Sequence, residues 1–118
     1  MRPRWIALWS AAILVGAALI KPISDSVSIV AWMASYEVVH IVAHLFLYGS
    51  LMAIALRAGL SEGRAALLTL LIAVMQEGIQ VVTAGRAPGL PELFDIGVDS
   101  VAIVAVVLVT RHRRRAPA

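Results

Sequence analysis

The chain has 118 residues, of which 61% are hydrophobic and 14% are charged, and it contains no cysteine. A soluble domain carries about 25% charged residues, and a chain of this size has too little interior to hide so much apolar surface from water. The composition therefore predicts an integral membrane protein rather than a soluble helical bundle, and the length predicts one domain over residues 1–118. Disulfides, thiolate nucleophiles and cysteine metal ligands are excluded.

The first apolar run covers residues 5–20 and has Ser10 as its only polar side chain. A secretory signal peptide and a retained transmembrane helix are the two interpretations of such a run behind a basic N-terminus. Bulky Leu19 and Ile20 stand where signal cleavage requires small residues. A retained helix over residues 4–23 is therefore preferred, and it is long enough to cross about 30 Å of hydrocarbon.

Residues 21–36 contain Pro22 and several polar side chains, so a connector is predicted there. Beyond it, Gly59 fits the stop of a helix, Ser61 fits an N-cap, and Pro91 fits the first residue of a helix. These signals divide the remaining apolar sequence into three further helices, over residues 34–57, 63–83 and 91–110. The predicted fold is an all-α, polytopic membrane protein with a bundle of four transmembrane helices.

The positions of lysine and arginine orient the four predicted helices. Only Lys21 and Arg86 lie at one side of the bundle, and eight arginines lie at the other: Arg2, Arg4, Arg57, Arg64, Arg111, Arg113, Arg114 and Arg115. Cytoplasmic loops carry an excess of these residues, so both termini are predicted to face the cytoplasm. The basic tail over residues 111–115 is interpreted as an anchor against anionic lipid, and no nucleic-acid partner is expected.

Polar side chains gather in the predicted outer half of three helices. They are His40, His44 and Tyr48 on the second helix, Glu77 and Gln80 on the third, and Asp95 and Asp99 on the fourth. Spacings of three and four residues place the members of each set on one helix face. Each ionisable group at mid-membrane costs about 2.5–3.5 kcal/mol on insertion scales. Several ionisable groups placed at one depth, despite this cost of insertion, predict a pocket or a polar network. The bare inner half disfavours a proton or cation conductor.

This ordered set resembles the VanZ-like family of small bacterial membrane proteins over residues 37–105. The pieces that carry the resemblance are His44-xxx-Tyr48, Glu77-xx-Gln80, Arg86 and Asp95-xxx-Asp99. The family has Asp-Lys where this chain has His40 and Ile41, Asn where it has Asp99, and Gly where it has Ala102. The carboxylate gained at Asp99 and the lysine lost at Ile41 make the site of this chain more acidic.

The resemblance implies a multi-pass protein of the bacterial cytoplasmic membrane with a polar site in the outer leaflet. The family takes its name from a protein linked to low-level resistance to the glycopeptide teicoplanin. The expected function is binding or modification of an envelope lipid, including a lipid-linked cell-wall or glycolipid ligand. In this interpretation Arg86 meets a phosphate, while the carboxylates meet sugar hydroxyls or amines.

Two alternatives stand beside lipid binding. One is a membrane-embedded hydrolase. In its metal version a divalent metal is bound, near His40, by four residues: His44, Glu77, Asp95 and Asp99. In its other version Glu77 and His44 act as an acid–base pair on a lipid ester or phosphate. The spacing of the four residues matches no known metal signature, so no metal and no other cofactor is predicted, and the catalytic residues are unassigned. The other alternative is a purely structural network in which Tyr48 donates a hydrogen bond to Glu77. Solvated positions are expected for Asp25, Glu37 and Glu92, and the oligomeric state is not predicted.

Overall fold

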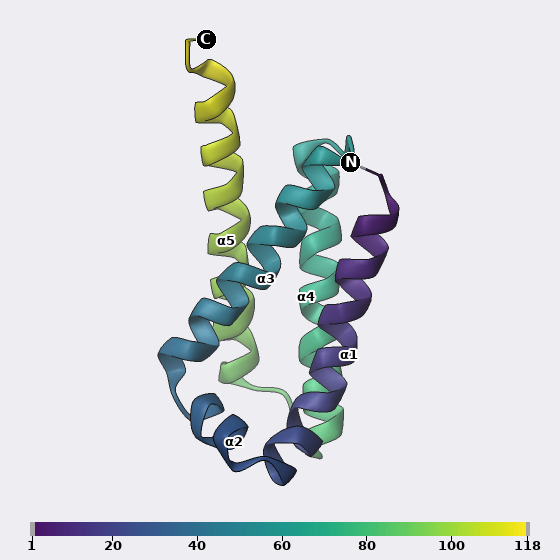
Figure 1. Ribbon diagram of the computed structural model, residues 1–118, viewed down its shortest axis with the longest axis vertical. Helices are drawn as coiled ribbons and strands as arrows, with labels where there is room; N and C mark the ends of the chain where they lie inside the picture. Colours follow the sequence, from purple (N-terminus) through teal and green to yellow (C-terminus); the bar gives the residue numbers. More distant parts are fainter. Residues whose placement is uncertain (1, 118) are drawn as a thin grey trace.

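The computed structural model describes residues 2–117, and all regular structure in this range is helical. The helices are α1 (Arg4–Ser26), α2 (Ser28–Ala34), α3 (Glu37–Arg57), α4 (Glu62–Ala84) and α5 (Leu90–Arg115). All but α2 are long and apolar enough to cross a membrane, which confirms the predicted all-α fold with four long helices. Both termini lie at one end of an elongated bundle, and α2 and the α4–α5 loop lie at the other (Figure 1).

The predicted connector over residues 21–36 is wrong for most of its length. Helix α1 continues through Pro22 to Ser26, α2 occupies Ser28–Ala34, and α3 begins only at Glu37. Proline removes one hydrogen bond of a helix and usually ends it. The bond that Pro22 removes is the one to the Ala18 carbonyl, four residues earlier, and the helix continues past this single loss. In its last turn the Ser26 hydroxyl donates to the Pro22 carbonyl at 2.8 Å.

The other helix boundaries follow the turn residues of the sequence. Gly59 has a φ of 99° and Gly85 a φ of 66°, a left-handed backbone that favours glycine after a helix. The Ser61 hydroxyl accepts a hydrogen bond from the Arg64 N–H at 3.3 Å, as predicted for an N-cap. Pro91 lies in the first turn of α5, where its missing N–H removes no helical hydrogen bond.

Small residues fill the contacts between the long helices. The buried alanines at these contacts are Ala17, Ala55, Ala65, Ala73 and Ala102. Helix α3 packs most extensively on α5, and at Gly49 a Cβ atom would stand 3.7 Å from the Val106 side chain. Small side chains let helix backbones approach closely, which is the usual way that helices pack without water to drive them together.

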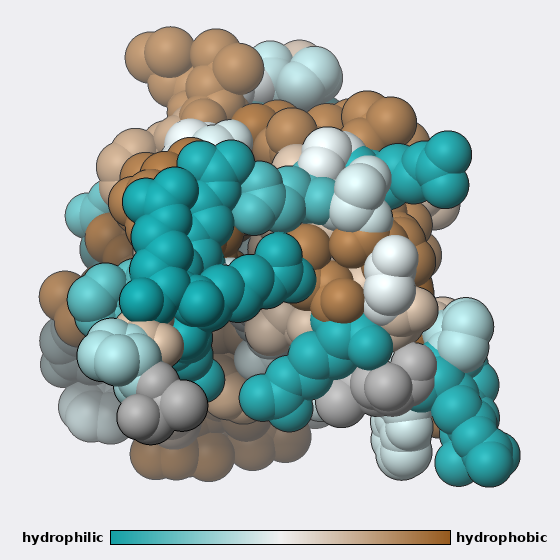
Figure 2. Space-filling model, turned by 90° about the horizontal axis from the view of Figure 1, so that it is seen from above, coloured by the Kyte–Doolittle hydropathy of each residue, from teal (hydrophilic) through white to brown (hydrophobic). Residues whose placement is uncertain are grey.

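The outer surface of the bundle separates apolar sides from a polar end. Large hydrophobic side chains point away from the core, and Leu67, Val82 and Leu90 are 70–80% exposed. Hydrophilic side chains gather at the end that carries both termini (Figure 2). At this end Arg111 reaches Glu62 at 2.6 Å and ties α5 to the start of α4.

Candidate functional site

The structure brings polar side chains of α3, α4 and α5 together in the half of the bundle nearest α2. Those that are buried include His44, Tyr48, Glu77, Asp95 and Asp99, all of which were predicted to share a site. Each lies within about three turns of the same end, because α3 and α5 start there and α4 ends there.

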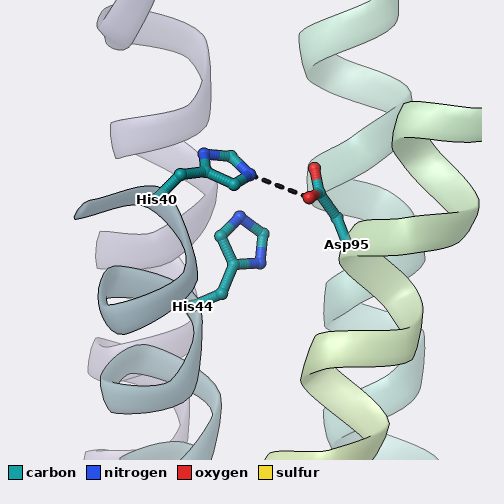
Figure 3. Close-up of side chains that lie close together, drawn as sticks. All are labelled: His40, His44 and Asp95. Atoms are coloured by element: carbon teal, nitrogen blue, oxygen red, sulfur yellow. Dashed lines mark hydrogen bonds and ion pairs between the residues drawn. The ribbon is translucent and has the colours of Figure 1, made fainter. Parts of the chain in front are cut away.

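His40 and Asp95 form the pair nearest that end of the bundle. The His40 Nε2 atom lies 2.8 Å from Asp95 Oδ1, and the two side chains are partly and mostly buried, respectively (Figure 3). His40 stands where the VanZ-like pattern has an acid. In this chain it contributes a base that meets the carboxylate of α5.

His44 and Asp99 form a second pair one turn deeper. The His44 Nδ1 atom lies 2.7 Å from Asp99 Oδ1, and both side chains are almost fully buried. The His40 and His44 ring centres are 4.5 Å apart, and the other nitrogen of His44 turns toward the His40–Asp95 pair (Figure 3). Two histidines of α3 and two aspartates of α5 therefore form a ladder across one helix contact.

Tyr48 ends this ladder, and its partner differs from the one expected. Its hydroxyl donates to the Gln76 side-chain oxygen, not to Glu77. Gln76 was not predicted as a site residue. Its position four residues before Gln80 on α4 was the available signal, because that spacing places both amides on one helix face.

Glu77 is the least satisfied member of the group. Its side chain is buried, and neither carboxylate oxygen has a hydrogen-bond donor as partner among the described residues. The Oδ2 atom of Asp99 also has no hydrogen-bond partner among the described residues. The negative charge of Asp95 also acts on Glu77. The centre of the site is thus rich in acceptor oxygens and poor in donors.

Arg86 and Glu92 lie beside the ladder and form a separate ion pair. A guanidinium nitrogen of Arg86 contacts Glu92 Oε1, and Glu92 Oε2 accepts a hydrogen bond from the Gly89 N–H at 2.6 Å. Glu92 is only 6% exposed, so the expectation that it is solvated is wrong: it caps α5 and pairs with the loop. Asp25 and Glu37 are exposed, as expected.

Two cavities reach the ladder from different directions. The lateral cavity, about 330 Å³, opens between α1, α3 and α4 and is lined by Trp9, Ile13, Gly16, Ile20, His40, His44, Gln76 and Gln80. The end cavity, about 510 Å³, opens beside the α4–α5 loop and is lined by Ser35, Glu37, His40, Gln80, Arg86, Phe94 and Asp95. His40 and Gln80 line both cavities, so the two cavities are neighbours at these side chains.

Helix α1 contributes a wall that the sequence pattern did not assign to the site. The Trp9 indole N–H donates to the Leu47 carbonyl at 3.0 Å and joins α1 to α3 beside the lateral cavity. Ser10 is buried, and its hydroxyl has no partner among the described residues. Ser10 was the only polar residue of the first apolar run, which was the signal available for this wall.

Comparisons with models of known protein families, with curated proteins and with solved structures found no match to the chain. The likeness to the VanZ-like family therefore depends on the residue pattern given above, and the function must be argued from the geometry of the site.

Proposed function

We propose that the chain is a multi-pass protein of the bacterial cytoplasmic membrane, with both termini in the cytoplasm. Four long apolar helices with outward-facing hydrophobic side chains support insertion. An even number of crossings places both termini on one side. The excess of arginine at their end of the bundle supports the cytoplasmic side for it. The ladder and the end cavity then lie in the outer leaflet.

Labelling of single cysteines tests this orientation, and the cysteine-free chain needs no background substitutions. A membrane-impermeant maleimide added to intact cells is expected to modify a Ser35→Cys variant, whose site lies at the α2–α3 junction. It is expected to leave an Ala116→Cys variant unmodified until the cells are opened. The reverse pattern would mean that the bundle is inserted the other way round.

We propose further that the site binds the polar head group of an envelope lipid or glycolipid. The observation that carries this proposal is that His40 and Gln80 line both the lateral and the end cavity. An amphipathic ligand needs an apolar space beside the acyl chains and a polar space at the same depth as its head group. The lateral cavity can take the acyl chain, and the end cavity can take the polar head group.

The residues around each cavity fit the two halves of such a ligand. Apolar and small side chains of α1, among them Ile13, Gly16 and Ile20, leave room for an acyl chain at the lateral cavity. Arg86 contacts Glu92 through one guanidinium nitrogen and is half exposed, so it keeps further N–H donors for a phosphate at the end cavity, which His40 also lines. Asp95 offers an acceptor to sugar hydroxyls or to an amine.

Gln80 is the residue with which to test this proposal. Its side-chain amide makes no hydrogen bond within the described part of the chain, yet it lines both cavities. A Gln80→Leu variant keeps the size of the side chain and removes the amide. We expect it to bind a polar-head-group lipid about tenfold more weakly, since one hydrogen bond to a charged group contributes about 1.5–3 kcal/mol.

The measurement is a titration of purified protein in detergent with phospholipids and glycolipids, followed by native mass spectrometry. Thr83→Val is the matched control, because it removes a polar group one turn further along α4 whose hydroxyl bonds only to its own helix. Equal lipid affinities in the wild type, Gln80→Leu and Thr83→Val would reject a head-group site at His40 and Gln80.

A further inference from the structure

Three ionisable residues from three helices converge deeper in the bundle than His40 and Gln80. His44 of α3, Glu77 of α4 and Asp99 of α5 are 3%, 4% and 0% exposed. One potential ligand atom of each lies within 4.8 Å of those of the other two. Three helices therefore supply one nitrogen and two oxygen ligands to a common point in the interior.

The carboxylates at this point lack the donors that buried carboxylates need. Both oxygens of Glu77 and the Oδ2 atom of Asp99 have no donor as partner among the described residues. An ionised group buried without a compensating charge or hydrogen bond is costly, and the cost is higher in a membrane than in a soluble protein. His44 reaches Asp99 Oδ1 and leaves the other three oxygens unsatisfied.

No arginine or lysine supplies the missing charge in the described structure. Arg86, which follows α4 at this end, is paired with Glu92 instead. Lys21, the other cation at this end of the bundle, is exposed and paired with Asp25 at 3.3 Å. The deficit of positive charge at Glu77 and Asp99 is therefore local, and neither Arg86 nor Lys21 corrects it.

A second group of potential ligands lies one helical turn nearer the α2 end of the bundle. His40, His44 and Asp95 also have ligand atoms within 4.8 Å of one another, and they share His44 with the deeper group. One nitrogen of His44 turns toward His40 and Asp95 (Figure 3). His40 and His44 also line the lateral cavity, so His44 belongs both to the deeper group and to the wall of a cavity.

We propose that His44, Glu77 and Asp99 hold one divalent transition-metal cation of the zinc or manganese kind. An imidazole nitrogen with two carboxylates suits Zn²⁺, Mn²⁺ or Fe²⁺, whereas Mg²⁺ and Ca²⁺ favour sites built from oxygen alone. A cation of charge +2 balances the two carboxylates and satisfies their unpaired oxygens. Three protein ligands also leave a coordination position for water or for another oxygen ligand.

The cation site does not require the lipid proposed above, because all three of its ligands belong to the chain. It also differs from a structural network. A network predicts that these groups satisfy one another, whereas here three carboxylate oxygens have no donor.

The test uses the full chain, purified in lipid-free detergent without a polyhistidine tag and stripped with a chelator. Zn²⁺ and Mn²⁺ are then titrated by isothermal calorimetry, and bound metal is counted by elemental mass spectrometry. We expect one equivalent per chain and a melting temperature that rises with the concentration of the metal. Glu77→Gln and Asp99→Asn are expected to weaken binding at least tenfold.

Glu62→Gln is the matched control, since Glu62 is the first residue of α4, at the end of that helix opposite Glu77, and pairs with Arg111. It is expected to bind metal like the wild type. Circular dichroism identifies any variant that does not fold. The proposal is overturned if folded wild-type protein binds no stoichiometric Zn²⁺ or Mn²⁺. It is also overturned if folded Glu77→Gln and Asp99→Asn both bind as tightly as Glu62→Gln, or if only Mg²⁺ or Ca²⁺ binds.

Discussion

A His44→Leu variant is expected to lose about 3–5 kcal/mol of the free energy of unfolding, because it leaves the Asp99 carboxylate buried without its only donor. Replacing both His44 and Asp99 is expected to change the free energy of unfolding much less. In a His44→Leu/Asp99→Leu variant neither member of the pair remains buried without the other, and apolar side chains replace both at the helix contact. We expect this double variant to recover most of the lost stability.

Unfolding in mixed micelles, measured in the presence of a chelator, gives these free energies without any contribution from bound metal. His112→Leu is the matched control, since His112 is exposed in the last turns of α5, and its effect should stay within about 0.5 kcal/mol. The interpretation of His44 and Asp99 as a coupled buried pair fails if His44→Leu is as stable as His112→Leu. It also fails if the double variant is no more stable than the single one.

A Gly16→Phe variant is expected to reduce lipid binding at least tenfold while leaving the bundle folded. Gly16 lines the lateral cavity, and a Cβ atom added there meets no other atom within 4 Å. The phenyl ring therefore has room to occupy the cavity without displacing a neighbouring backbone. It takes the space proposed for an acyl chain, and a tenfold loss corresponds to about 1.4 kcal/mol.

Gly97→Phe provides the control for Gly16→Phe. Gly97 is an exposed helical glycine of α5, a Cβ atom there also meets nothing within 4 Å, and it does not line the lateral or the end cavity. The same change of residue is thus made outside the site. Lipid affinity that falls equally in both variants would point to a general effect of the added ring, and unchanged affinity in Gly16→Phe would place the acyl chain elsewhere.

Much of the fold followed from local features of the sequence. Apolar runs long enough to span a membrane predicted the four long helices, and Gly59, Ser61 and Pro91 marked helix ends, because each of these signals acts within a few residues. The segment around Pro22 was misjudged for a physical reason. Proline and serine usually interrupt helices, but a proline removes only one helical hydrogen bond, and α1 continues through Pro22 to Ser26.

The candidate site was predictable in its members but not in its pairings. Helical spacing placed His40 and His44 on one face and Asp95 and Asp99 on another, and a common depth followed from the helix order. The sequence holds no information on which atoms meet. Side-chain contacts between helices depend on how the helices rotate and cross, and a sequence pattern does not specify this. In the structure Tyr48 pairs with Gln76 rather than Glu77, and Arg86 pairs with Glu92.

The central claim is that an envelope lipid occupies the lateral and end cavities, which share His40 and Gln80, and native mass spectrometry of the wild-type protein tests it most directly. The protein would be extracted from bacterial membranes in a mild detergent and analysed without added lipid. We predict one retained lipid or glycolipid per chain with a polar head group, and its loss from Gly16→Phe and Gln80→Leu but not from Gly97→Phe. The account would be contradicted if folded wild-type protein retains no lipid. It would also be contradicted if Gly16→Phe retains the lipid as the wild type does.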